Sequence, residues 1–167
     1  MCPCDGTLST EEYAPVVETV RSGVLQQPDL LLEPLRRRIQ RLAEEQRFEE
    51  AATVRDRHQA LARALERRRA WQAMQEAGML EVEARGGDCA VLDRGHLVHA
   101  WRTGTHPPLI PAPVPDPVVT PVPPDVMVAE EAHLLWKWMT SAGTRLVQGE
   151  GALALPVPAV PSLTALE

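Results

Sequence analysis

Residues 33–69, EPLRRRIQRLAEEQRFEEAATVRDRHQALARALERRR, decide the fold of the first half of this chain. Apolar residues recur at the spacing of one helical face, interrupted by Glu45-Gln46-Arg47. The first stripe consists of Leu31, Leu35, Ile39 and Leu42. The second stripe comprises Phe48, Ala51, Ala52, Arg55, His58, Ala62 and Leu65. Two amphipathic helices joined by so short a break predict an antiparallel helical hairpin, which we place within residues 28–77.

Charge separates this segment from the rest of the chain. Residues 33–69 carry eleven Arg against six Glu and one Asp, a net charge of +4 on a chain whose net charge is −6. A basic helical segment favours an acidic partner or nucleic acid, whereas internal ion pairs on a solvated face would explain it equally well. The candidate nucleic-acid contacts are Arg36, Arg37, Arg38 and Arg41, and Arg67, Arg68 and Arg69 are left open for the same role.

Elements of other kinds flank the hairpin. Ser9 and Glu12 form the pattern of a capping box, which predicts a helix over residues 10–23 with Pro15 in its first turn. After the hairpin the period changes to that of strands, which we expect over residues 80–84, 89–92 and 96–101 as a three-stranded meander. The fold class predicted from these elements is α+β.

The last third of the chain is rich in proline. Residues 105–126 are expected to form an extended linker, because prolines this dense exclude helix and central strand. A helix is predicted over residues 128–141, with Ala132, Leu135, Trp136 and Met139 facing inward. Residues 144–147 and 153–155 are expected to pair as a short hairpin. The predicted divisions are therefore 1–27, 28–77, 78–104, 105–126, 127–156 and a disordered tail at 157–167.

Residues 2–66 resemble a stretch of the UvrC family of excision-repair nucleases. Cys4-Asp5-Gly6 is followed by Ser9-Thr10-Glu11-Glu12-Tyr13, and then by the hairpin. The hairpin is similar to the UVR motif of that family in its Ala43-Glu44 pair and in residues 48–56, FEEAATVRD. The resemblance continues more weakly through residues 80–104 and into the helix around Glu130.

The resemblance implies a docking module for nucleotide excision repair. UVR hairpins of the family pair with the similar hairpin of the helicase UvrB and bury the motif's Phe, which corresponds to Phe48. Full burial of a Phe side chain contributes about 1.5–3 kcal/mol, which fits a binding hot spot. In the alternative interpretation, Phe48 is not a partner contact and closes this chain's own hairpin. The partner-binding set that the resemblance implies is Phe48, Glu49, Ala51, Ala52, Arg55 and Asp56. Self-association through the hairpin is a further expectation.

Catalytic and metal sites of the family are not found in this sequence. The Cys2-Pro3-Cys4 pair cannot complete a four-thiolate cluster, and Cys89 lies far from it, so we expect no metal and no cofactor. Neither a GIY-YIG pattern nor the acidic residues of an RNase H-like site is present, so we expect no catalytic residue. The resemblance implies that Cys4 corresponds to the last ligand of the family's iron–sulfur cluster, here without its partner ligands. This favours a fragment of a longer protein, whose parent would be a DNA nuclease.

Two alternatives to a UvrC-like docking region remain. The chain resembles the C-terminal part of actinobacterial fusions of a DEDD exonuclease to a UvrC-like GIY-YIG half. UVR-like hairpins also occur in adaptors of Clp-type proteases, although those adaptors usually carry complete cysteine pairs. No signal peptide or membrane span is evident, so a cytoplasmic location is expected.

Overall fold

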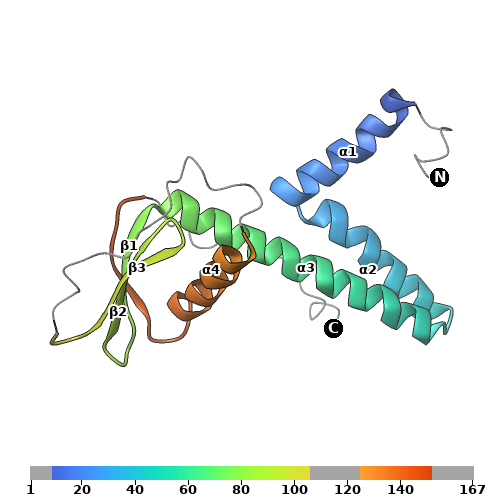
Figure 1. The fold of residues 1–167 in the computed structure, drawn as a ribbon. Helices are drawn as coiled ribbons and strands as arrows, with labels where there is room; N and C mark the ends of the chain where they lie inside the picture. The colour runs from blue at the N-terminus through green and yellow to red at the C-terminus, as the bar shows by residue number, and fades with distance from the viewer. Residues whose placement is uncertain (1–8, 106–124, 152–167) are drawn as a thin grey trace. The chain divides into compact units, whose positions relative to one another are not determined.

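A computed structural model of the chain describes residues 9–105 and 125–151. The predicted α+β class is confirmed, because these residues contain both helices and an antiparallel sheet (Figure 1). The helices are α1 (Thr10–Leu25), α2 (Asp29–Glu44), α3 (Phe48–Ala77) and α4 (Val126–Met139). The strands are β1 (Met79–Glu83), β2 (Asp88–Asp93), β3 (His96–Arg102) and β4 (Arg145–Gly149).

The described residues fall into two compact units. The first, the hairpin unit, contains α1, α2 and α3 up to Glu66. The second, the sheet unit, begins at Arg67 and contains the rest of α3, the sheet and α4. Helix α3 thus contributes residues to both units.

The N-terminus of α1 is closed by the predicted capping box. The Ser9 hydroxyl oxygen accepts a hydrogen bond from the Glu12 backbone N–H at 3.2 Å, and the Glu12 carboxylate accepts one from the Ser9 N–H at 2.9 Å. These bonds satisfy two N–H groups that a helix start leaves open. The expectation that Pro15 lies in the first turn is wrong: the helix begins at Thr10, so Pro15 lies in the second turn.

The turn between α2 and α3 has the hydrogen bonds of a Schellman motif. The Arg47 N–H donates to the Leu42 carbonyl at 2.9 Å, and the Gln46 N–H donates to the Ala43 carbonyl at 3.0 Å. Gln46 adopts a φ of 58°, the left-handed conformation that this position requires. The predicted break at residues 45–47 is therefore a helix stop in which Gln46 stands where glycine is usual.

The core of the hairpin confirms the predicted α2 stripe and corrects its partner on α3. Leu42, Ala51 and Val54 are buried together, with Leu35 and Ile39 packed against them. Arg55 is exposed and Ala52 is half-buried, so the inward face of α3 is displaced from the predicted stripe toward Val54. The α2 core also includes Leu32, which is completely buried and was not predicted.

The sheet unit contains one more paired strand than the predicted meander. The strand order is β3-β2-β1-β4, and every neighbouring pair is antiparallel. The β2–β3 turn has positive φ at Arg94 (46°) and Gly95 (85°), which is the primed turn that suits a two-residue hairpin. The additional strand is β4, which pairs with β1. The sequence predicts that this segment pairs with residues 153–155, which lie outside the described residues.

Helix α4 covers the core of the sheet unit. The buried cluster consists of Ala77, Leu80, Val82, Ala90 and Leu92. Leu135 and Met139 of α4 pack against it as predicted, but Trp138 does so in place of Trp136. The Glu131 carboxylate accepts a hydrogen bond of 3.0 Å from the Leu97 N–H, next to the irregularity in the β2–β3 pairing.

Candidate functional site

The face of α3 that is turned away from α2 carries most of the residues assigned to partner binding. Phe48, the one phenylalanine of the chain, is 65% exposed, although large apolar side chains are usually buried. Ala52 and Arg55 follow it at four and seven residues, so the three side chains share a helical face. Glu49 and Asp56 lie beside them and are exposed.

Ala51 occupies a different position from the rest of this set. It is 8% exposed and belongs to the buried cluster with Leu42 and Val54. Its small side chain lets α2 and α3 approach each other. Phe48 is not needed to close this core, because the cluster is complete with aliphatic residues. We call the strip of Phe48, Glu49, Ala52, Arg55 and Asp56 the Phe48 face; all of these residues are exposed except Ala52, which is half-buried.

An ion-pair cluster sits at the edge of the Phe48 face. Arg47 binds the Glu50 carboxylate through two nitrogens, each at 2.7 Å, and the Glu45 carboxylate at 2.8 Å. The guanidinium lowers the pKa of Glu50 through these hydrogen bonds, and Glu50 and Glu45 raise the pKa of Arg47. Arg55 lies 3.3 Å from Asp56. Pairs this exposed contribute little to stability but orient the charges around Phe48.

The four arginines of α2 do not share one face. Arg37, Arg38 and Arg41 are exposed, whereas Arg36 is turned toward the interior of the hairpin unit. Glu33 pairs with Arg36 at 3.3 Å and with Arg37 at 2.9 Å. Glu33 therefore offsets part of the positive charge of this segment through ion pairs within α2.

His58 lies on the buried side of α3, where an aliphatic residue would suit the packing. Its side chain is 1% exposed. Burial, followed by the positive charge of Arg36, lowers the pKa of His58 below its usual value. Neither His58 Nε2 nor Arg36 Nε has a hydrogen-bond partner among the described residues. Protonation of His58 is therefore expected to destabilise the hairpin core.

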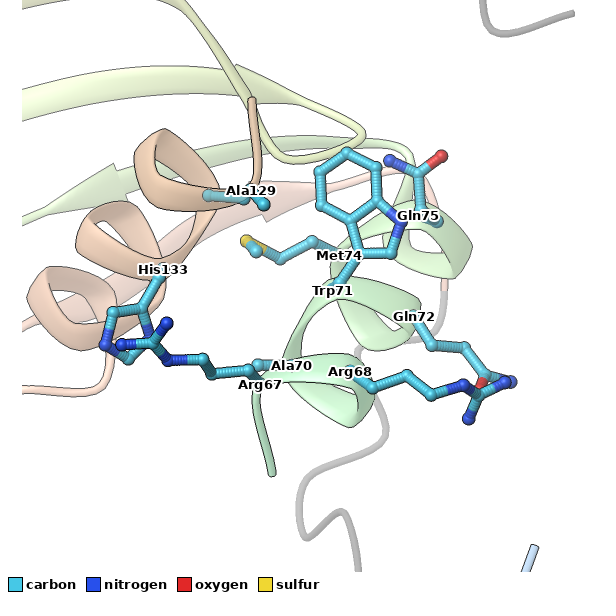
Figure 2. A pocket seen from close by; sticks show the side chains of 10 residues that line it. Arg67, Arg68, Ala70, Trp71, Gln72, Met74, Gln75, Ala129 and His133 are labelled. Atoms are coloured by element: carbon cyan, nitrogen blue, oxygen red, sulfur yellow. The ribbon is translucent and has the colours of Figure 1, made fainter. Parts of the chain in front are cut away.

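A pocket of about 520 Å³ lies in the sheet unit, between the second half of α3 and α4 (Figure 2). We call it the α3–α4 pocket. Its lining from α3 is Arg67, Arg68, Ala70, Trp71, Gln72, Met74 and Gln75, and its lining from α4 is Ala129, Ala132 and His133. The sequence marked Arg67 and Arg68 as basic residues but did not reveal the pocket, because its two walls are some sixty residues apart in the chain.

The wall of the pocket at Trp71 is held by the β2–β3 turn. The Trp71 ring meets that of His96 edge-on, with centroids 6.1 Å apart. A side chain at Gly95 would come within 3.1 Å of the Trp71 ring, so glycine allows the turn to approach the helix. The Gln75 side-chain amide donates a hydrogen bond to the Arg94 carbonyl at the same turn. These contacts hold α3 and the Trp71 indole against the β2–β3 turn.

Metal-binding clusters are not found in the part of the chain that the structure describes. Within residues 9–105 and 125–151, no group of three or more His, Cys, Asp or Glu residues is placed to hold an ion. Cys89 is buried and its thiol is free, while Cys2 and Cys4 lie outside these ranges. No helix in the same ranges combines the length and the apolar character needed to cross a membrane.

The described residues form a helical hairpin that exposes the Phe48 face, and a second unit built on an antiparallel sheet. Comparison with curated proteins finds a local similarity to one family. The chain is 36% identical over 85 residues to UvrABC system protein C of Natronomonas pharaonis, which is 51% of this chain and 13% of that protein. The identity to the proteins of the same name is 38% over 69 residues in Syntrophus aciditrophicus and 42% over 65 residues in Nocardia farcinica.

The chain therefore carries a UvrC-like family region, as the sequence resemblance predicted. These matches cover 39% to 51% of the chain but only 10% to 13% of the relatives' lengths. No family model matches the chain, and no solved structure matches it.

Proposed function

We propose that this chain is a non-catalytic docking region of a UvrC-like DNA-repair nuclease, and that it binds a UvrB-type helicase through the Phe48 face. Its catalytic partners in such a protein would lie in other domains. The proposal rests on similarity to UvrABC system protein C together with one structural observation, the exposure of Phe48.

Exposure of a large apolar side chain beside a complete core supports docking over the alternative role for Phe48. Leu35, Ile39 and Leu42 on α2 already cover the buried side of α3. Phe48 therefore keeps most of its apolar surface in water, and covering that surface with a second hairpin would be favourable. The alanine at position 52 leaves room for a partner helix close to the α3 backbone.

The test is the affinity of the full chain for the C-terminal hairpin of a UvrB-type helicase, measured by titration calorimetry. Phe48→Ala is expected to weaken binding by about ten- to a hundredfold, from the loss of roughly 1.5–3 kcal/mol of apolar burial. Far-UV circular dichroism should remain unchanged, because Phe48 does not contribute to the hairpin core.

Leu134→Ala is the matched control. Leu134 on α4 is also 65% exposed, so its truncation removes a comparably accessible apolar side chain elsewhere. The control should leave the affinity unchanged. Equal affinities for the wild-type chain and Phe48→Ala would contradict the proposal. If sedimentation shows that Phe48→Ala abolishes a dimer while the helicase hairpin never binds, the surface serves a second copy instead.

A further inference from the structure

We propose that the α3–α4 pocket binds one nucleotide of a single-stranded nucleic acid, with its base over the apolar floor and its flanking phosphates at Arg67 and Arg68. This site goes beyond the docking function and does not depend on it, because every pocket residue belongs to the sheet unit.

The floor of the pocket suits a flat aromatic ring. Ala70, Met74 and Ala132 are buried beneath this floor, and the half-exposed Trp71 supplies the aromatic surface on which a base can stack. Figure 2 shows Trp71 and Met74 between Ala129 of α4 and the arginine side chains of α3. The volume of about 520 Å³ lies within the usual range for small-ligand sites. Bases of either nucleic acid stack on tryptophan with little dependence on sequence.

An arginine stands on each of two sides of this floor. Figure 2 shows Arg67 and His133 at one side and Arg68 with Gln72 at the other. Arg68 reaches Gln72 through a hydrogen bond of 3.4 Å, which orients its guanidinium along the rim. A strand that inserts one base places a phosphate before it and another after it. Cations on both sides of an apolar centre match that alternation of charge.

Carboxylates lie close to the arginines of the site. Glu76 accepts a hydrogen bond of 2.8 Å from the Gln72 amide, which also binds Arg68. Glu130 of α4 pairs with Arg67 at 3.2 Å, and both side chains are more than half exposed. Ion pairs this exposed are weak, so Arg67 can exchange the carboxylate for a phosphate at little cost. When Arg67 binds a phosphate, it displaces counterions from the strand, and this release favours the exchange at low salt. Glu131, the neighbouring acid, is occupied with the Leu97 N–H instead.

The test is fluorescence anisotropy of a labelled ten-residue oligothymidylate titrated with the full chain. Arg67→Gln/Arg68→Gln is expected to weaken binding at least tenfold and to reduce the slope of log affinity against log salt by about 1.4, which is two contacts at about 0.7 each. Arg57→Gln/Arg63→Gln is the matched control, since it removes the same charge from exposed positions of α3 outside the pocket. The control should change affinity less than twofold.

A second comparison isolates the base. An abasic oligonucleotide of the same length keeps the phosphates and should bind at least fivefold more weakly, as expected for the loss of about 1 kcal/mol or more of stacking. Ala129→Glu places a carboxylate at an exposed position on the pocket wall. This variant should bind oligothymidylate more weakly than the wild-type chain does. The corresponding RNA is expected to bind comparably, because stacking and phosphate contacts do not read the sugar.

Three results would overturn the site: no saturable binding, equal affinity for the abasic strand, or equal losses in the two arginine pairs. If Ala129→Glu instead abolishes binding of the helicase hairpin and spares the oligonucleotide, the pocket serves a protein partner. Phe48→Ala should leave oligonucleotide binding unchanged, so failure of docking and failure of the pocket are distinguishable.

Discussion

At the scale of single residues, the most informative position is Gln46 in the turn of the hairpin. Its φ of 58° places a side chain where glycine has no steric penalty. Gln46→Gly should raise the free energy of unfolding of the hairpin by about 1 kcal/mol, because the left-handed conformation costs a residue with a Cβ about 1–2 kcal/mol. Thermal unfolding followed by far-UV circular dichroism measures the change.

Gln40 provides the control for this prediction. It is an exposed residue inside α2, where glycine is expected to reduce stability by up to about 1 kcal/mol. Both variants replace glutamine by glycine, but they should change the free energy of unfolding in opposite directions. Destabilisation by Gln46→Gly would mean that the Gln46 side chain makes a contact more valuable than the strain it causes.

His58 makes the hairpin sensitive to acid. Because burial and Arg36 lower its pKa in the folded chain, the unfolded chain binds the proton first as pH falls. Stability is therefore complete above the unfolded pKa of about 6.5 and declines below it. The thermal midpoint of the helical signal should fall between pH 7 and pH 5 for the wild-type chain, and less steeply for His58→Leu. Parallel pH profiles of the two proteins would rule out His58 as the source.

Features that depend only on the spacing of residues along the chain are predicted correctly from the sequence. Ser9 and Glu12 form the predicted cap, since its partners are three residues apart. The inward positions on α3 and α4 were displaced by a few residues, as Val54 and Trp138 show. A hydropathy pattern rich in alanine leaves the phase of a helix ambiguous, and tertiary packing decides it.

At the scale of elements, α1 and α2 meet at a glycine. A Cβ added to Gly23 would lie 2.4 Å from Leu31 Cγ, closer than packing allows. Gly23→Ala favours the helix locally by about 1 kcal/mol, but the overlap with Leu31 is expected to cost about 1–3 kcal/mol. We therefore expect a net loss of stability or a displaced α1, measurable by hydrogen exchange of the α1 amides.

Leu31→Ala supplies the check on that explanation. The double variant Gly23→Ala/Leu31→Ala removes the overlapping atoms, so it should recover part of the exchange protection that Gly23→Ala loses. If the double variant is less protected than either single variant, the cause is loss of apolar burial rather than overlap.

The helices and the first three strands were predictable because each has its own local signal. Turn residues and alternation mark β1 to β3, and Glu45-Gln46-Arg47 marks the hairpin turn. The pairing of β4 with β1 was not predictable, because it joins segments more than sixty residues apart. For the same reason the α3–α4 pocket was missed, although the arginines at its rim stood out in the sequence.

At the scale of the whole molecule, two cores lie in one chain. Leu42 belongs to the core of the hairpin unit and Leu92 to that of the sheet unit. Each is nearly inaccessible, so replacement by alanine should cost about 2–5 kcal/mol. All four tryptophans lie in the sheet unit, so tryptophan fluorescence reports on that unit alone.

Leu42→Ala is expected to reduce the helical signal at a temperature where tryptophan fluorescence is still native, and Leu92→Ala to alter the fluorescence first. The double variant should show the sum of the two effects, as independent sites do. Coincident loss of both signals in either single variant would show instead that α3 couples the two cores into one cooperative transition.

The bond between Glu131 and Leu97 has a consequence for measurement in solution. The Leu97 N–H donates to a side chain of α4, beside the shift of register in the β2–β3 ladder. Its deuterium uptake will therefore follow the rate at which α4 separates from β3, whereas amides between β1 and β2 will follow opening of the sheet. The exchange rate of this single amide thus reports how often the α4 wall of the α3–α4 pocket opens, without any probe being added to the protein.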